Sequence, residues 1–361
     1  MTPIPSPSAL AATSLPLDGE LPGYGHVLAV AFEPSSSSVI SGLLHKVAEL
    51  TWYVRWDREA GLGRVIARPQ PGRPGRIGFL AGGCVLTATW RQAVSAPSVR
   101  VWSPDMSAVQ HEVAGRLLHL DASTGQGWLA VGGQVERWDL LAGARLDVLE
   151  SPSVRAALEG AFRPRTVAGG ARPVVVAAPG AACIAVVDLM TGAELLSRDV
   201  GFEISRLVVA PALPWVAVTG FDGEVVAYEL TSGEEAARLA WPEERVAESV
   251  AFHPVAPWLC IPHESGGLTL QDLATGEAVQ RWPADPDPNS GPIDVLHVIH
   301  AAAGTRVAAA HMNQRLLVAE VGQPGWRSAW EGVEPITACA ANGAGLIVCG
   351  DQSGAVTFLQ L

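Results

Sequence analysis

One phrase recurs along the chain, and a phrase that recurs indicates a repeated structural unit. A short extended stretch ends in an acidic residue, a turn containing glycine follows, and a second extended stretch comes after it. Each copy predicts two antiparallel strands joined by a tight turn. The clearest copies are QVERWDLLAGARLDVL (134–149), CIAVVDLMTGAELLSR (183–198), EVVAYELTSGEEAARL (224–239) and LTLQDLATGEAVQRW (268–282).

The phrase returns at the period of a propeller blade. The position before the acidic or polar residue occurs eight times, at intervals of 46, 36, 49, 41, 43, 48 and 40 residues. A four-stranded blade takes about 40–45 residues, whereas helical repeats need long amphipathic runs, for which SVRAALEGAF (153–162) is the one candidate. The eight residues that share this column are Trp56, Trp102, Trp138, Val187, Tyr228, Gln271, Ala319 and Leu359.

Upstream of the phrase, the copies share two further apolar stretches. In SVAFHPVAPWLCIPHESGGLTLQDL (249–273), an apolar strand, a His-Pro turn and a second apolar strand lead into the phrase, and RLVVAPALPWVAVTGFDGEVVAYEL (206–230) matches this pattern closely. Each unit therefore predicts four short strands, here called a to d. The sequence thus predicts an all-β fold, a propeller of four-stranded blades.

These units resemble WD40 repeats, in which a strand ending in Trp-Asp precedes a Thr-Gly turn. Gly25-His26 is similar to the opening of such a repeat, and Trp138-Asp139 matches its closing dipeptide. The resemblance covers about residues 24–361 and implies a WD40-like β-propeller that binds partners through its loops. Only the first unit carries Gly-His, so we expect apolar packing to hold the blades together in place of the family's buried polar network.

The two ends of the chain are expected to close the propeller. The last unit stops after strand c, and ATSLPLDGEL (12–21) is placed to supply its fourth strand by pairing with residues 355–361. We therefore expect residues 1–23 to form an arm with a closing strand and residues 24–361 to form a single propeller domain. This count favours eight blades, and seven is the alternative if residues 33–70 form a lid.

Charge and composition narrow the choice of partner. The net charge is −12, with 12 basic and 13 acidic residues over 1–150 and 12 basic and 23 acidic residues over 151–361. An acidic surface repels phosphate backbones, so we expect no direct contact with nucleic acid and a partner with a basic surface. No apolar stretch is long enough to span a bilayer and the N-terminus lacks a basic leader region, so we expect no membrane insertion and a cytoplasmic location. The single lysine among 24 basic residues is typical of a G+C-rich bacterial genome.

The residues of the chain that could carry chemistry do not form a convincing site. The five cysteines are scattered without a CxxC pair, which predicts free thiols in a reducing compartment. His263 and His311 lie in neighbouring turns, but their number and spacing favour ordinary histidines over a metal site. We therefore predict no catalytic residue, no metal and no cofactor. The cysteines are Cys84, Cys183, Cys260, Cys339 and Cys349.

One enzymatic alternative stays open. Quinoprotein dehydrogenases are also eight-bladed, and their repeats carry a docking motif that Asp272, Thr275, Gly276 and Trp282 approach. In that family the Trp lies closer to the turn and recurs in most blades, which is not the pattern here. The favoured function is therefore a non-catalytic scaffold or recognition subunit that contacts other proteins within a larger complex.

Such a scaffold would bind its partner through the turns between strands b and c, with an acidic patch beside them. Phe221 next to Asp222 offers an apolar anchor, and the residues from Asp222 to Glu248 carry a net charge of −6. A patch of one sign steers a basic partner and sets its orientation. The predicted partner-binding residues are Phe221, Asp222, Glu234, Glu235, Glu243, Glu244, His263, Glu264, Met312, Asn313, Asp351 and Gln352.

Overall fold

Strands make up nearly all of the secondary structure in the computed structural model, which confirms the all-β prediction. Among the described residues, the exceptions are a 3₁₀ turn, η1 (Ala81–Gly83), and one helix, α1 (Pro152–Glu159), which begins one residue before the only segment expected to form one. The structure describes residues 8–9, 11–14, 17–18, 25–34, 36–45, 50–66, 70–90, 96–159, 167–169, 174–177, 182–240, 250–284, 293–301, 304–311, 314–342 and 344–360.

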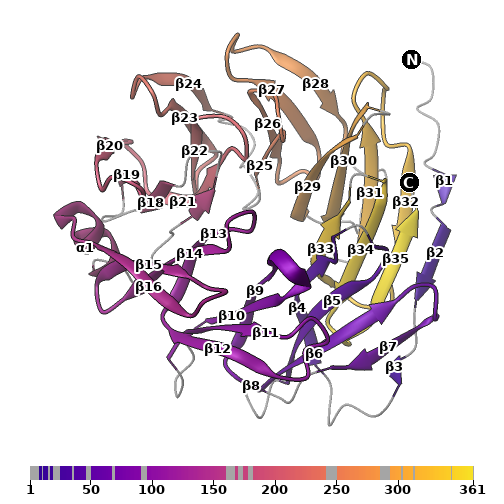
Figure 1. Ribbon diagram of the computed structural model, residues 1–361. Helices are drawn as coiled ribbons and strands as arrows, with labels where there is room; N and C mark the ends of the chain where they lie inside the picture. The colour runs from indigo at the N-terminus through magenta and orange to yellow at the C-terminus, as the bar shows by residue number, and fades with distance from the viewer. Residues whose placement is uncertain are drawn as a thin grey trace. The chain divides into compact units, whose positions relative to one another are not determined.

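The chain forms two compact units, of which the first comprises residues 1–9 and 149–333. Its described residues form four sheets, each built from four consecutive antiparallel strands (Figure 1). A further strand of the N-terminal arm, β1 (Ser8–Ala9), lies parallel to the outer strand of the fourth sheet. The strands of the four sheets are β17 (Val167–Gly169), β18 (Val174–Ala177), β19 (Cys183–Asp188) and β20 (Glu194–Asp199); β21 (Ile204–Val209), β22 (Trp215–Gly220), β23 (Glu224–Glu229) and β24 (Glu235–Ala240); β25 (Ala251–Phe252), β26 (Trp258–Pro262), β27 (Leu268–Asp272) and β28 (Ala278–Trp282); and β29 (Ile293–Ala301), β30 (Gly304–His311), β31 (Arg315–Glu320) and β32 (Ser328–Glu331).

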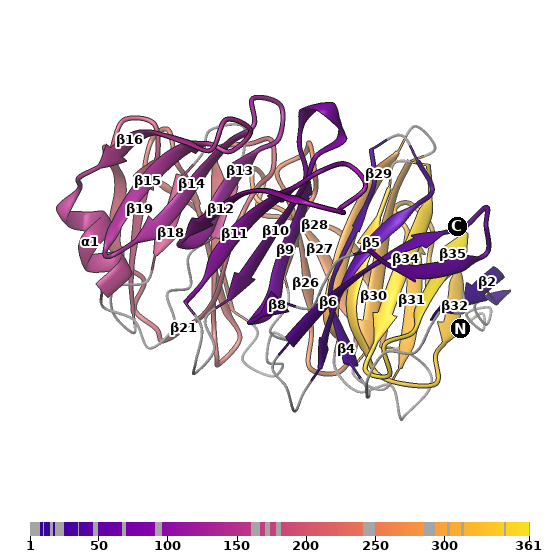
Figure 2. The same cartoon turned by 60° about the horizontal axis from the view of Figure 1, so that its bottom comes forward.

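The second unit, residues 10–148 and 334–361, also contains four sheets. Figure 2 shows one of them with β9 and β12 at its two edges. Short segments add to another, where β3 (Leu17–Asp18) lies parallel to β7 and β8 (Gln70–Pro71) pairs with β6. The strands are β4 (Gly25–Phe32), β5 (Val39–His45), β6 (Leu50–Asp57) and β7 (Leu62–Val65); β9 (Arg73–Phe79), β10 (Val85–Trp90), β11 (Ser98–Trp102) and β12 (Val109–Ala114); β13 (Arg116–Asp121), β14 (Gln126–Val131), β15 (Gln134–Asp139) and β16 (Ala144–Leu149); and β33 (Ile336–Ala341), β34 (Leu346–Asp351), β35 (Val356–Gln360) and β2 (Ala11–Ser14).

Each residue of the repeat column lies at or near the end of the third strand of its sheet, as predicted. In several sheets the acidic residue that follows it caps the turn to the fourth strand. The Asp188 Oδ1 atom accepts hydrogen bonds from the backbone N–H groups of Met190 (2.7 Å) and Thr191 (3.0 Å), and Asp272 Oδ1 accepts one from Ala274 (2.8 Å). Aspartate favours such turns because its short side chain satisfies backbone donors two or three residues ahead. This capping explains why the acidic position recurs.

The N-terminal arm supplies the fourth strand of the last sheet, as predicted. Strand β2 runs antiparallel to β35, with Ser14 opposite Thr357 and their hydroxyl oxygens 2.7 Å apart. The same sheet packs against β4: Thr337 Oγ1 donates to the Val27 carbonyl oxygen (2.5 Å), and a Cβ atom at Gly350 would lie 2.2 Å from Val27 Cγ1. The first and last repeats of the sequence are therefore in contact. The eight-blade count and the division into 1–23 and 24–361 stay predictions.

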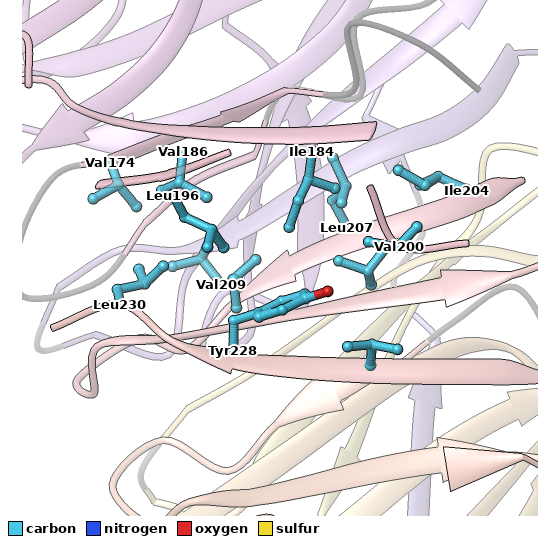
Figure 3. Packing of buried hydrophobic residues seen from close by; sticks show 13 residues of the cluster. Val174, Ile184, Val186, Leu196, Val200, Ile204, Leu207, Val209, Tyr228 and Leu230 are labelled. Atoms are coloured by element: carbon cyan, nitrogen blue, oxygen red, sulfur yellow. The ribbon is translucent and has the colours of Figure 1, made fainter. Parts of the chain in front are cut away.

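Apolar side chains fill the space between successive sheets within each unit. In the first unit, one cluster joins β18, β19 and β20 to β21, β22 and β23, with Ile184, Val186, Val216 and Val218 wholly buried. Figure 3 shows this cluster, with the Tyr228 ring lying among the aliphatic side chains. Burying such surface on both faces of each sheet is the main stabilising contribution expected for stacked sheets. The prediction that apolar packing holds the sheets together is confirmed for this pair of sheets.

Candidate partner-binding surface

The turn between β22 and β23 carries a partly exposed aromatic side chain, although the two strands that it joins are buried. Both strands are almost entirely buried, yet Phe221 is 45% exposed and Asp222 beside it is exposed. The half-buried Phe202, from the loop before β21, packs under the turn so closely that a Cβ atom at Gly220 would lie 2.8 Å from its ring. Phe221 thus follows a closely packed glycine at the end of a buried strand.

Glu234 and Glu235 lie at the opposite end of β23. Glu234 ends the turn before β24 and Glu235 begins that strand, about 20 Å along β23 from Phe221 at about 3.3 Å per residue. Glu235 is also ion-paired, because its two carboxylate oxygens accept hydrogen bonds from Arg238 at 2.7 and 2.9 Å. The structure therefore does not bring these glutamates to the aromatic turn: sequence neighbours separated by one strand end up at opposite ends of the sheet.

His263 does not present its ring to solvent, contrary to the prediction from its turn position. It is 5% exposed, and its Nε2 atom lies 2.8 Å from Thr269 Oγ1 on the neighbouring strand. The turn folds the side chain back onto its own sheet, where the hydroxyl of Thr269 provides a partner. Glu264, the next residue, is exposed and stays a candidate.

His311 is wholly buried at the end of β30. His263 and His311 therefore do not form a pair of histidines exposed at the surface. Within the part of the chain that the structure describes, no three His, Cys, Asp or Glu side chains gather in a way that could hold a metal ion.

Asp351 has a structural role in the turn between β34 and β35. Its Oδ1 atom accepts hydrogen bonds from the Ser353 backbone (2.9 Å), the Ser353 hydroxyl (2.7 Å) and the Ala355 backbone (3.0 Å). These bonds use its carboxylate locally, so Gln352, which is exposed, is the better contact residue of the pair. The remaining predicted residues, Glu243, Glu244, Met312 and Asn313, lie outside the described residues.

The residues that suggested a quinone-docking motif have structural roles as well. Asp272 caps its turn and its Oδ2 atom accepts a hydrogen bond from Trp258 Nε1 (3.2 Å). Trp282 is 2% exposed and packs in the apolar cluster that joins two sheets of the first unit. Both side chains are thus explained by turn formation and packing.

The structure also reveals a basic group on strands β9 and β13 that the sequence analysis did not single out. Burial lowers the pKa of Arg116 to about 10, and burial together with repulsion from Arg76 lowers the pKa of His119 to about 4. A bulge at Leu118 shifts the register, so that Arg116 and His119 lie opposite Ala130 and Trp128, on one face of the sheet. On a regular strand, residues three apart point to opposite faces of the sheet, so it is the bulge that places Arg116 and His119 on the same face. The bulge carries no sequence signal, which is why this pair was missed.

Comparison with known proteins identifies the fold. No family model matches the sequence, and no curated protein matches it. The chain is similar to the solved structure of the C-terminal WD40 domain of Sif2, with 11% identity over 99% of each chain and a TM-score of 0.68. It is also similar to the computationally designed Ika8 protein, with 17% identity over 97% of this chain and 100% of that one and a TM-score of 0.67. No described helix is long and apolar enough to cross a membrane. The chain therefore has a WD40-like β-propeller fold.

Proposed function

We propose that this protein is a non-catalytic scaffold or recognition subunit that binds other proteins within a larger complex in the bacterial cytoplasm. The observation that carries the proposal is Phe221, a large aromatic residue 45% exposed on a turn between two buried strands. Buried aromatic anchors dominate the affinity of many protein interfaces. A fixed turn also loses little conformational entropy when a partner binds.

The surroundings of Phe221 favour a partner with a basic surface. Asp222 is exposed beside it, Glu203 is exposed next to Phe202 in the sequence, and Glu224 follows at the start of β23. Arg206 on β21 is the basic residue nearest in register, opposite Thr219. Among the described residues named here, three carboxylates and one guanidinium give a net negative charge, which raises the association rate of a basic partner. The acidic surface argues against direct nucleic-acid binding.

Affinity purification of the tagged full chain from its native host, with mass spectrometry of the proteins that co-elute, identifies the partner. Binding is then measured kinetically for three single variants. We expect Phe221→Ala to increase the dissociation rate at least tenfold, because it removes the anchor, and Asp222→Lys to slow association at low salt. Val255→Ala is the matched control, since Val255 is 56% exposed but lies in the turn between β25 and β26.

The variant Glu234→Lys tests whether the other end of β23 contributes. Because Glu234 lies away from the aromatic turn, we expect it to change the association rate less than Asp222→Lys does. If Phe221→Ala and Asp222→Lys both leave binding within twofold of the unaltered chain, the proposed contact face is wrong.

A further inference from the structure

Two cysteines of the last sheet lie directly opposite each other. Strand β33 pairs antiparallel with β34, and the register places Cys339 opposite Cys349. Their Sγ atoms are 3.0 Å apart. Nothing in the sequence marks the pair, because the ten-residue spacing brings them together only through the strand register.

The backbone at this position suits a disulfide. The Asn342 N–H donates to the Leu346 carbonyl oxygen (3.0 Å), so this pair of residues is hydrogen-bonded. Hydrogen-bonded and non-hydrogen-bonded pairs alternate along antiparallel strands, and the register is unbroken from Ala338 to Ala341, so Cys339 and Cys349 form a non-hydrogen-bonded pair. In such pairs the Cα atoms are about 4.5 Å apart, within the range of about 4.4–6.8 Å found for disulfides. The bond can therefore form with little movement of the strands.

The two thiols differ in accessibility, which sets an order of reaction. Cys349 is 2% exposed, and burial raises the pKa of its thiol well above its usual range, as does the neighbouring Cys339 thiol. Cys339 is half-buried, so it is the more accessible thiol of the two. A reagent in solution will therefore meet Cys339 first, and Cys349 will act as the resolving thiol.

We propose that Cys339 and Cys349 form a reversible dithiol–disulfide pair, a modification site for low-molecular-weight disulfides. The Cys339 thiolate attacks one sulfur of the reagent, the reagent's S–S bond breaks, and its other sulfur leaves as a thiolate. Cys349 then attacks Cys339 Sγ in the mixed disulfide and expels the second half of the reagent as a thiolate. The two protein thiols are oxidised by two electrons, the reagent is reduced to two thiols, and the two protons pass to the leaving thiolates.

The location gives the bond a structural consequence. Strands β33 and β34 both contact β4, and the sheet is completed by β2. A cross-link between β33 and β34 would hold together the two strands on which this contact depends. We expect the oxidised chain to unfold at a higher denaturant concentration than the reduced chain, although the closed loop is short and the gain correspondingly small.

The experiment exposes the native full chain to mixtures of oxidised and reduced glutathione. We expect at least two of the five thiols per chain to be lost, and peptide mass spectrometry to find a Cys339–Cys349 link that dithiothreitol reverses. Cys84, whose Sγ donates to Gln110 Oε1 (3.5 Å), serves as the internal control and stays reduced.

Single variants test the order of reaction. Cys349→Ser should stop at a glutathione adduct on Cys339, whereas Cys339→Ser should leave Cys349 unmodified in the folded chain. Cys339→Ala is a second variant in case serine disturbs the sheet, and its circular dichroism spectrum verifies folding. The proposal is overturned if the native chain keeps five free thiols in oxidised glutathione, if another pair links first, or if Cys349 reacts as readily as Cys339.

Discussion

The third strands β6 and β19 end in the same turn but bury very different side chains before it. In the second unit, Trp56 is 1% exposed and its Nε1 atom donates to Ser41 Oγ on the neighbouring strand (2.7 Å). In the first unit, Val187 is equally buried and offers no polar atom. The residue that follows, Asp57 or Asp188, caps the turn through two backbone N–H groups in each case.

This difference teaches which feature of the repeat specifies the sheet. The buried position tolerates an indole or an isopropyl group because the apolar clusters around it adapt in volume. The capping carboxylate recurs because the backbone donors of the turn are the same in both sheets. The turn and the alternation of apolar residues therefore define the repeat, and the indole–hydroxyl pair is a local addition.

The largest effect should come from truncating the two buried side chains. We expect Trp56→Ala to lower the free energy of unfolding by about 3–5 kcal/mol, because it opens a large cavity and leaves the Ser41 hydroxyl without its donor. Val187→Ala should cost roughly 1–3 kcal/mol, since it removes only two methyl groups. The free energies of unfolding of the two variants are measured from their guanidinium unfolding curves and compared.

A double variant separates the cavity from the hydrogen bond. Trp56→Phe should lower the free energy of unfolding less than Trp56→Ala does. Adding Ser41→Ala to Trp56→Phe should restore about 1 kcal/mol of it, because the hydroxyl that has lost its donor is removed. Equal losses in Trp56→Ala and Val187→Ala would contradict the distinction between the two sheets.

A smaller effect is expected on the pH dependence of stability, and it follows from the different surroundings of two histidines. In the first unit, His253 Nδ1 accepts hydrogen bonds from the backbone N–H groups of Val255 and Ala256, so Nε2 carries the proton and donates to Thr305 Oγ1 (2.8 Å). In the second unit, the His119 ring lies 5.3 Å from that of Trp128, and burial followed by repulsion from Arg76 lowers its pKa from 6.5 to about 4.

The depressed pKa of His119 predicts how stability changes with pH. The unfolded chain binds a proton at this residue below pH 6.5, whereas the folded chain does so only near pH 4. The contribution of His119 to the free energy of unfolding is therefore fully present above pH 6.5 and is lost as the pH falls towards 4. After allowance for solvent screening, we expect a loss of about 1–2 kcal/mol over this interval. Unfolding measured from pH 7 to 4 should show a smaller fall in His119→Gln, and an unchanged fall would contradict the assignment.

The smallest effect should be common to both sheets. We expect Asp57→Ala and Asp188→Ala each to cost about 0.5–2 kcal/mol, because each removes the acceptor for two backbone donors of its turn. Asp57→Asn and Asp188→Asn keep the Oδ1 acceptor and should retain most of the stability. If the asparagine variants lose as much as the alanine variants, charge and not turn capping explains the recurring acid.

Most of the strands could be predicted because the pattern that specifies them is local. Alternating apolar residues and the capped turns mark each sheet, and the strand missing from the last repeat pointed to β2. Strand β1 was not predicted, and Leu17–Asp18, which we expected to belong to the closing strand, forms β3 and pairs with β7 instead. Their parallel pairing depends on where the arm runs, which local sequence does not encode.

The candidate site was harder to predict because it depends on side-chain direction and register. A turn position predicted an exposed His263, but Thr269 holds the ring against the sheet. Residues 222–248 look like one acidic segment in the sequence, but strand β23 separates Asp222 from Glu234. The opposition of Cys339 and Cys349 likewise required the register of two strands. Phe221 is 45% exposed, and its role as an anchor stays a prediction.

The pairing of β2 with β35 has a consequence for synthesis. Ser14 and Thr357 are 343 residues apart, so the ribosome makes one partner long before the other. At about 5–20 residues per second, the arm waits roughly 20–70 s for its strand. During that time the early repeats can fold, while the arm keeps unsatisfied backbone groups that chaperones or other nascent chains can bind. The last sheet is therefore completed only after β35 has been synthesised, long after the arm has left the ribosome.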